Sequence, residues 1–456
     1  MKGKGTEENK GGPLWSVLQR VEGDKVIMII ILLLLMVSFL AIFSSTPMLP
    51  TQDTRLETMT EHGVVALLGI GLMIFLYNVK IDRWRWLAKI GFVGSAALLL
   101  MLLMKIDIGF IRTQTINGAV RNFLVAGFQV HVFEIVKVWM IMYLAWALNA
   151  LKEEKSGDED KRMKLADMLT EKVKWLDFLK KPFWRRAFYI YCPTMIIGMM
   201  IFFGSGSSAI FVCAILIATM LLGDIPFRDI FLAFMAVAVI FGGMVAIHKI
   251  SDGKLVKRVG TMISRMNADY DIDRLEGLKG DEYNNMVDTL SQPVSALIAV
   301  HEGGVIGKGI GNSTQKYRVQ NIYGDYMYSF LIEEYGLLGG IAILILYVSL
   351  LARSSIIARM CNNNFAKYIL GGMSILITGQ AFMHILVNVD IGPMTGQTLP
   401  LISHGASAFV IFCAAFGLIL SVSRMAKKKM EKVEILTQEN KNNIEENIEK
   451  AAKIKD

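Results

Sequence analysis

The stretch VIMIIILLLLMVSFLAIFS, residues 26–44, decides the fold class of this chain. Its length is close to the roughly 20 apolar residues with which an α-helix crosses a bilayer. The stretch follows Lys25 and has no small-residue cleavage site, so it predicts a retained anchor and not a signal peptide. Across all 456 residues, 54% are hydrophobic, 19% are charged and the mean hydropathy is +0.46, which predicts a polytopic membrane protein.

Further segments of the chain show the same apolar character and predict additional membrane-spanning helices. The complete set of predicted spans is 26–44, 63–79, 88–105, 132–152, 187–203, 207–222, 228–248, 326–352, 366–389 and 403–424. The predicted fold class is therefore all-α, a polytopic membrane protein with about ten transmembrane helices and one large extracytoplasmic loop.

Lysine and arginine gather in the connections on one side of the predicted membrane. Lys80, Arg83 and Arg85 lie in one connection, Arg353 and Arg359 lie in another, and the run RMAKKKMEK begins at residue 424. Because positive residues mark the cytoplasmic side, we expect a multi-pass membrane protein with both termini in the cytoplasm. The predicted divisions are a cytoplasmic segment 1–25, transmembrane helices 1–7 in 26–248, the extracytoplasmic loop 249–325, transmembrane helices 8–10 in 326–424 and a cytoplasmic tail 425–456.

Two connections are long enough to carry structure of their own. Residues 152–186 place apolar side chains at helical spacing, which predicts an amphipathic helix on the membrane surface; a hairpin that only connects two spans is the alternative. These apolar residues are Leu165, Met168, Leu169, Val173, Leu176 and Leu179. The glycine-rich loop 249–325 predicts short ordered helices and a glycine-built turn.

Several functional classes are excluded by composition and spacing. The four cysteines show no paired spacing, which excludes a disulfide framework and a zinc site. The net charge of +8 comes from basic residues beside apolar segments, so membrane topology explains it and nucleic acid is not an expected partner. The run GKGIGNS, residues 307–313, lacks the Walker spacing. Its glycines either permit tight turns or, with Lys308 and Lys316, let backbone N–H groups approach a phosphate.

Three motifs carry a resemblance to a known family. They are NGAVRNFLVAGFQVHVFEIVK at 117–137, GGVIGKGIGNSTQKY at 303–317 followed by YGDYMYSFLIEEYGLLGG at 323–340, and QAFMHILVNVDIGPMTGQTLPLISHGASAF at 380–409. Together they resemble the signature regions of the SEDS family, the shape, elongation, division and sporulation proteins. The stretches 311–313 and 395–403 are more similar to the division subfamily than to the elongation subfamily. His384 stands where an asparagine is typical of the family.

The resemblance implies an activity, a catalytic residue and partners. SEDS proteins are peptidoglycan glycosyltransferases that polymerise lipid II, and they work with a class B penicillin-binding protein transpeptidase and other division proteins among the membrane lipids. The catalytic aspartate of the family corresponds to Asp325. Resemblance and charge together predict as substrate-binding residues Arg121, Glu134, Lys137, Lys308, Gln315, Lys316, Ser403 and Ser407. No protein metal site is expected, and a divalent cation, Mg²⁺ or Mn²⁺, accompanying the diphosphate is left open.

The chemistry of glycan extension also points to a carboxylate at the outer membrane edge. A sugar hydroxyl attacks an anomeric carbon that already carries a good diphosphate leaving group, so the reaction needs a base for the hydroxyl proton. Asp325 would serve, with basic side chains for the diphosphate. The alternative role for Asp325 is capping of the helix that follows.

Other polar residues have competing structural roles. Glu134 and Lys137 share a helix face, either as part of a polar cavity or as a structural ion pair. Glu333 lies about 12 Å along the helix from the aspartate, so we assign Glu333 and Glu334 to packing or gating. Ser403 and Ser407 either line the cavity or cap a helix.

Three functional classes are weighed. A lipid II polymerase is the leading hypothesis. A flippase that transports the lipid-linked precursor is the alternative, because a ten-span protein with interior charges also suits transport. A scaffold that recruits a cross-linking enzyme is the third.

Overall fold

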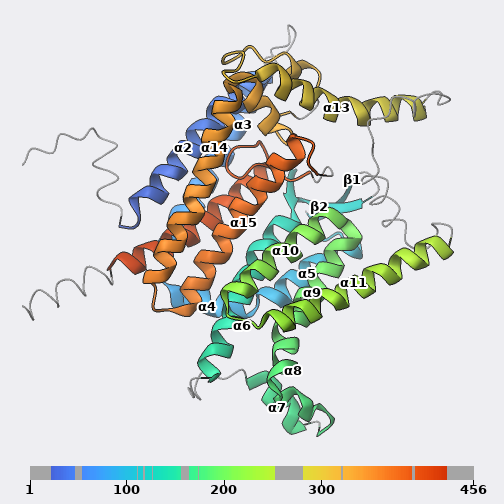
Figure 1. Ribbon diagram of the computed structural model, residues 1–456, viewed down its shortest axis with the longest axis vertical. Helices are drawn as coiled ribbons and strands as arrows, with labels where there is room; N and C mark the ends of the chain where they lie inside the picture. Colours follow the sequence, from blue (N-terminus) through green and yellow to red (C-terminus); the bar gives the residue numbers. More distant parts are fainter. Residues whose placement is uncertain are drawn as a thin grey trace, which may run out of the picture.

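The computed structural model describes residues 22–46, 54–109, 111–116, 119–125, 127–155, 164–172, 174–251, 281–319, 322–392 and 396–428. Helices pack side by side to form most of the molecule (Figure 1). In this view a small sheet and α13 lie toward the upper end, while α7 and α8 project at the lower end.

All ten predicted spans coincide with helices. These are α2 (Lys25–Ser45), α3 (Thr54–Asn78), α4 (Ile81–Lys89) with α5 (Gly91–Leu103), α6 (Val132–Lys155), η3 (Ala187–Tyr191) with α9 (Cys192–Gly204), α10 (Gly206–Leu222), α11 (Phe227–Ile250), α14 (Met327–Met360), α15 (Asn364–Asn388) and the helix Ala406–Lys428. Within the described ranges, 7 helices are long and apolar enough to cross a membrane, or 8 if the pair α4–α5, bent by 50°, is one span. The polytopic helical fold is confirmed, and the count of ten stays a prediction.

The two ends of the described chain meet on one side of the bundle. The Asp24 N–H donates to Ser423 Oγ at 2.7 Å, and the Asp24 carboxylate pairs with Arg353 at 2.6 Å. Lys428 pairs with Glu22 at 2.7 Å. Helix α2 therefore begins on the side of the bundle where the helix Ala406–Lys428 ends. An even number of membrane crossings between them requires this arrangement.

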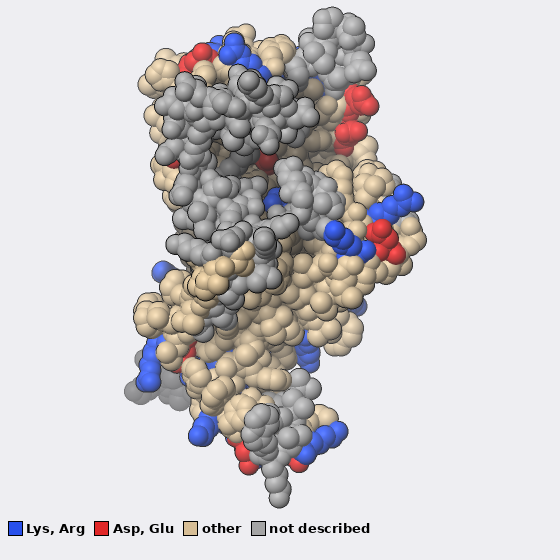
Figure 2. All heavy atoms as spheres, turned by 90° about the vertical axis from the view of Figure 1, so that its right-hand side faces the viewer, with Lys and Arg blue, Asp and Glu red and all other residues tan. Residues whose placement is uncertain are grey.

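The side surface of the helical bundle, between its upper and lower ends in Figure 1, exposes apolar side chains. Leu67, Leu68 and Phe75 of α3 are all more than half exposed. On the face shown in Figure 2, a zone with few charges separates the charged side chains of the upper and lower parts. A lipid environment explains this exposure, since water would penalise a continuous apolar band.

A three-stranded antiparallel sheet follows α5, and the all-α prediction missed it. Its strands are β1 (Ile111–Ile116), β2 (Ala119–Val125) and β3 (Phe128–His131), in the order β1-β2-β3. Asn122 pairs with His131, and α6 begins at Val132 directly after β3. The sheet thus brings the polar residues of the first motif to the start of α6.

Helix α14 is broken at Gly336, where the glycine loop packs against it. Gly336 has φ 70° and ψ −177°, and a Cβ there would lie 2.3 Å from the Val305 carbonyl oxygen. The Leu337 N–H donates to the Gly304 carbonyl at 2.9 Å. The glycine-built turn is confirmed, although it follows a 23-residue helix, α13 (Asp281–Gly303), and not only short helices. Residues 252–280 of the predicted loop lie outside the described residues.

The segment 152–186 is not one amphipathic helix. It contains α7 (Lys164–Lys172), the 3₁₀ helix η2 (Lys174–Lys180) and α8 (Pro182–Arg186). Pro182 explains the last break, because proline is favoured at the first position of a helix and disfavoured within one. Residues 156–163 of this segment lie outside the described part of the chain.

Candidate active site

Asp325 lies in the turn before α14, at the end of the bundle where α6 begins and α15 ends. Its side chain is half-buried. Its backbone carbonyl accepts a hydrogen bond from Asn388 Nδ2 at 3.1 Å. A Cβ placed on Gly396, which has φ 62°, would lie 3.9 Å from the Asp325 Oδ2 atom. The loop between α15 and the last helix therefore runs directly beside the carboxylate.

The helix-capping role considered for Asp325 is carried out by α15 instead. The Tyr328 N–H donates to His384 Nε2 at 3.3 Å, and the Ser329 N–H donates to Asn388 Oδ1 at 3.0 Å. His384 Nδ1 lies 2.7 Å from the Gln397 carbonyl oxygen, so this nitrogen carries the proton and Nε2 is left as the acceptor. Within the described residues, no hydrogen bond reaches the Asp325 carboxylate, which leaves its oxygens available to a substrate.

Ser403 and its neighbour hold the backbone that precedes the aspartate. Ser403 Oγ donates to the Gly324 carbonyl at 2.8 Å and accepts from the Leu399 N–H at 2.9 Å. The His404 N–H donates to the Tyr323 carbonyl at 2.8 Å. The last helix begins only at Ala406, so the proposed helix-cap role of Ser403 is wrong and its role is to position the turn.

Ser407 connects the last helix to the sheet. Its hydroxyl oxygen accepts a hydrogen bond from the His131 N–H at 3.0 Å. His131 is the last residue of β3 and directly precedes Val132, where α6 begins. This hydrogen bond links the sheet, which carries Arg121 on β2, to the helix that follows the Asp325-facing loop.

Arg121 supplies positive charge near Asp325. Its Nε donates to the Gly204 carbonyl at the end of α9, at 3.3 Å. Burial raises the pKa of Asp325, and the Arg121 charge opposes that shift. Burial lowers the pKa of His131, which also senses Glu134, Lys137 and Arg121. Five titratable groups from two of the motifs therefore interact at this end of the bundle.

Lys137 is the centre of a buried hydrogen-bond network. Its side chain is 1% exposed, and Nζ donates to Glu134 Oε1 at 2.6 Å, Gln380 Oε1 at 2.7 Å and Gln397 Oε1 at 2.8 Å. Gln397 Nε2 donates onward to Ser208 Oγ at 3.2 Å, at the start of α10. An ammonium group has three donors, and all three are used. Lys137 thus holds the loop beside Asp325 through Gln397, and the predicted substrate-binding role of Lys137 and Glu134 stays a prediction.

Lys308, Gln315 and Lys316 gather in a second cluster around the two glutamates of α14. Glu333 accepts from Lys308 Nζ at 2.8 Å and from the Gln315 N–H at 3.4 Å. Glu334 accepts from Ser44 Oγ at 2.7 Å, and Lys316 Nζ donates to the Ser44 carbonyl at 3.2 Å. The assignment of Glu333 and Glu334 to packing agrees with these contacts, because the carboxylates fasten the glycine loop to α14 and α2.

Sequence reasoning missed the polar face of α15. Gln380, His384 and Asn388 are fully buried and occupy successive positions four residues apart. Residues at that spacing share one face of a helix, and three polar side chains on one face of an apolar helix are a usable signal. In the structure this face holds Lys137 and the start of α14, so it positions both halves of the site.

A metal ion would depend mainly on substrate oxygens. Among the described residues, no group of three or more His, Cys, Asp or Glu side chains is placed to hold an ion. Mg²⁺ commonly binds through one or two carboxylates together with substrate phosphates. Asp325 with a diphosphate fits that pattern.

Comparisons with known proteins agree with the motifs. Residues 24–428 match the family of FtsW, RodA and SpoVE, described as cell cycle proteins. A probable peptidoglycan glycosyltransferase FtsW from Pseudomonas fluorescens is 27% identical over 372 residues, covering 80% of this chain and 79% of the relative. Stage V sporulation protein E from Bacillus subtilis is 25% identical, covering 90% of this chain and 99% of the relative.

Solved structures share the fold. One, described as showing structural coordination of polymerization and crosslinking by a peptidoglycan synthase complex, is similar with a TM-score of 0.61 and 19% identity, covering 88% of this chain and 98% of that one. The rod shape determining protein RodA of Thermus thermophilus is similar with a TM-score of 0.57 and 19% identity, covering 89% of this chain and 98% of that one.

Proposed function

Because the chain belongs to the family of FtsW, RodA and SpoVE cell cycle proteins, we propose that it polymerises lipid II into peptidoglycan glycan strands during division. Relatives named probable peptidoglycan glycosyltransferase FtsW, from Pseudomonas fluorescens and Thioalkalivibrio sulfidiphilus among others, support the glycosyltransferase and the division role. One observation carries the assignment of the base. The Asp325 carboxylate is held beside Gly396 and near Arg121, while other residues cap the helix behind it.

Asp325 acts as the general base of the transfer. A hydroxyl oxygen of the acceptor sugar forms a bond to the anomeric carbon of the donor, and the bond from that carbon to the diphosphate oxygen breaks. The hydroxyl proton passes to the Asp325 carboxylate, and the bonding electrons leave with the diphosphate. A carboxylate whose pKa is raised by burial holds this proton more strongly, which favours the transfer.

Arg121 is the cation best placed to meet the substrate near Asp325. A guanidinium matches phosphate oxygens with several N–H donors. A Mg²⁺ or Mn²⁺ ion, if bound, would be held by the diphosphate and Asp325, and it would supply charge neutralisation to the leaving group. Lys137, in contrast, acts through Gln397, and Lys308 acts through Glu333.

The setting of the enzyme follows from its topology. The described ends of the chain meet on one side, where Arg353 and Lys428 also lie. We place this side in the cytoplasm and Asp325 at the outer face of the inner membrane. A class B penicillin-binding protein is the proposed partner, which fits the similarity to a chain of a complex that coordinates polymerization and crosslinking.

The test is Asp325→Asn in purified, reconstituted protein with labelled lipid II and the partner transpeptidase. The amide keeps the side-chain volume but accepts no proton, and loss of a general base typically costs about 10²–10⁴-fold in rate. We expect normal expression and lipid II binding with almost no glycan on a gel. Asp390→Asn is the matched control, because Asp390 is exposed, follows α15 and has φ 62°, which asparagine tolerates.

Two results would count against this assignment. Normal polymerisation by Asp325→Asn would remove Asp325 as the base. A variant that polymerises normally but no longer moves lipid II across vesicles would support the flippase alternative.

A further inference from the structure

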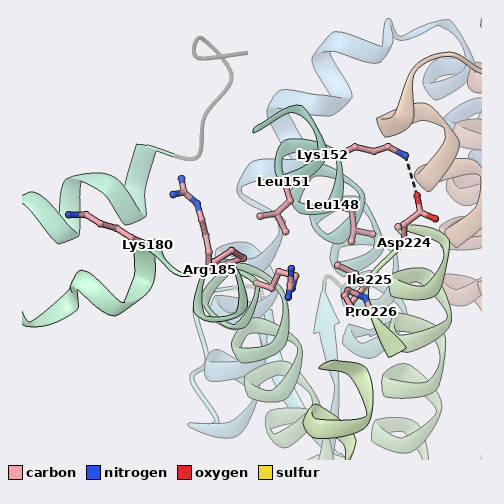
Figure 3. A pocket seen from close by; sticks show the side chains of 11 residues that line it. Leu148, Leu151, Lys152, Lys180, Arg185, Asp224, Ile225 and Pro226 are labelled. Carbon is pink, nitrogen blue, oxygen red and sulfur yellow. Dashed lines mark hydrogen bonds and ion pairs between the residues drawn. The ribbon is translucent and has the colours of Figure 1, made fainter. Parts of the chain in front are cut away.

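A pocket of about 400 Å³ opens at the end of the bundle opposite Asp325 (Figure 3). It lies between the end of α6, α8 and the connection from α10 to α11. Its lining residues are Leu148, Leu151, Lys152, Lys180, Pro182, Arg185, Arg186, Gly223, Asp224, Ile225 and Pro226. The lining therefore combines an apolar floor with four cationic side chains and one carboxylate.

The pocket lies at the level of the lipid headgroups. Glu134 and Lys152 are 18 positions apart on α6, which corresponds to about 27 Å at 1.5 Å per residue. The hydrocarbon core of a bilayer is about 30 Å thick, so a site at one membrane surface places this pocket at the other. Phe183 and Trp184 of α8 are 36% and 46% exposed beside it, as is typical of aromatic residues at a membrane interface.

The two arginines are held in fixed positions at the wall. Arg186 pairs with Asp229 at 2.6 Å, and Arg185 pairs with Asp167 at 3.1 Å. Neither Asp229 nor Asp167 lines the pocket. A guanidinium carries five N–H donors, more than one carboxylate accepts, so a paired arginine can still donate a hydrogen bond to a further acceptor.

Lys152 is held more loosely. It pairs with Asp224 at 3.2 Å, and the two side chains are 44% and 79% exposed. An exposed pair of this kind contributes about 0–1 kcal/mol, so an incoming anion displaces Asp224 at low cost. In Figure 3, Leu148, Leu151, Ile225 and Pro226 lie between this pair and Arg185, whereas Lys180 points away from them.

We propose that this pocket binds the phosphate headgroup of an anionic membrane lipid. Lys152 contacts the phosphate, the glycerol and upper acyl carbons lie against Leu148 and Leu151, and Arg185 and Arg186 add positive charge to the pocket wall. Basic pockets between transmembrane helices on the cytoplasmic side suit such headgroups. The site is about a bilayer thickness from Asp325, so it is separate from the transferase site.

The experiment is a titration of the full-length protein in neutral detergent with phosphatidylglycerol, read by native mass spectrometry. Phosphatidylcholine and inorganic phosphate are titrated in parallel. Lys152→Gln should weaken phosphatidylglycerol binding about fivefold, since a basic residue near the surface contributes about that factor. Asp224→Asn should strengthen it severalfold, because it removes the carboxylate that competes for Lys152. Asn is tolerated at the φ of 58° found there.

Matched controls lie on α4, at the same end of the molecule, where Arg85 pairs with Glu153 of α6. Lys89→Gln and Asp82→Asn change the charge of exposed side chains outside the pocket by the same amounts. Opposite effects of the two pocket variants, with both controls unchanged, are the expected result. Equal effects in the controls would overturn the proposal, as would equal binding of phosphatidylcholine. Competition by inorganic phosphate at the affinity of the lipid would assign the site to free phosphate instead.

Discussion

Replacing Lys137 by methionine tests the network that positions the active site. Methionine nearly fills the same space, so the change removes three donors without creating a large cavity. Glu134, Gln380 and Gln397 then lose their shared partner, and Glu134 is only 8% exposed. Leaving one member of a buried ion pair uncompensated costs about 3–5 kcal/mol. We expect a folded-state destabilisation of that order and a large loss of glycan synthesis.

Glu134→Gln should also be costly, because it leaves the Lys137 ammonium, which is 1% exposed, without its counter-charge. The amide still offers Nζ an oxygen acceptor, so we expect the loss to be no larger than that of Lys137→Met. The double variant Glu134→Gln with Lys137→Met removes the uncompensated charge. It should therefore be more stable than Lys137→Met alone, although it carries one more substitution.

The assay is thermal unfolding of detergent-solubilised protein together with the yield of membrane-inserted protein. Lys89→Met is the control, since that lysine is exposed at the end of α4 and its replacement should change stability by less than about 1 kcal/mol. Additive effects of the Glu134 and Lys137 substitutions, or a Lys137→Met variant as stable as the control, would refute the network.

Three further predictions concern the turn and the loop. Burial raises the pKa of Asp325, so the polymerisation rate should fall as the pH drops below this raised pKa, which lies above the ordinary aspartate range. Arg121→Gln removes the charge that opposes the shift, so the fall in rate should begin at a higher pH. Gly336→Ala should release the glycine loop, seen as faster limited proteolysis, because its Cβ would lie 2.3 Å from the Val305 carbonyl oxygen; an unchanged digestion pattern would contradict this. Ser403→Ala should lower kcat severalfold with little change in KM, and an unchanged kcat would show that the turn needs no such anchor.

The helices were predictable because they depend on local properties of the chain. Length and hydropathy of a segment decide whether it spans lipid, and every predicted span coincides with a helix. The sheet 111–131 was not predictable in the same way, since its strands are short and are stabilised by pairing with one another. The break at Gly336 also depends on a distant segment, the loop at Val305, which no local pattern reveals.

The motifs were sufficient to identify residues of the site. The role of a residue was harder to predict where it depends on contacts with distant parts of the chain. The motifs identified Asp325 and Arg121, which lie close enough for the Arg121 charge to oppose the rise in the Asp325 pKa, while their catalytic and binding roles stay predictions. Lys137 was predicted to bind substrate, but its three donors are used by protein acceptors. That distinction requires the positions of Gln380 and Gln397, which lie more than 240 residues away in sequence.

Glu333 and Asp325, two carboxylates at this end of the molecule, differ in whether protein donors already occupy their oxygen atoms. Glu333 accepts hydrogen bonds from Lys308, Ser313 and Thr314, so its lone pairs are occupied in the resting protein. A base must offer a lone pair to the incoming hydroxyl, which makes Glu333 unsuitable whatever its distance from substrate. Asp325 differs because Asn388 and His384 satisfy the helix donors that would otherwise compete for it. We therefore propose that the buried polar face of α15 assists catalysis by keeping the Asp325 carboxylate unoccupied.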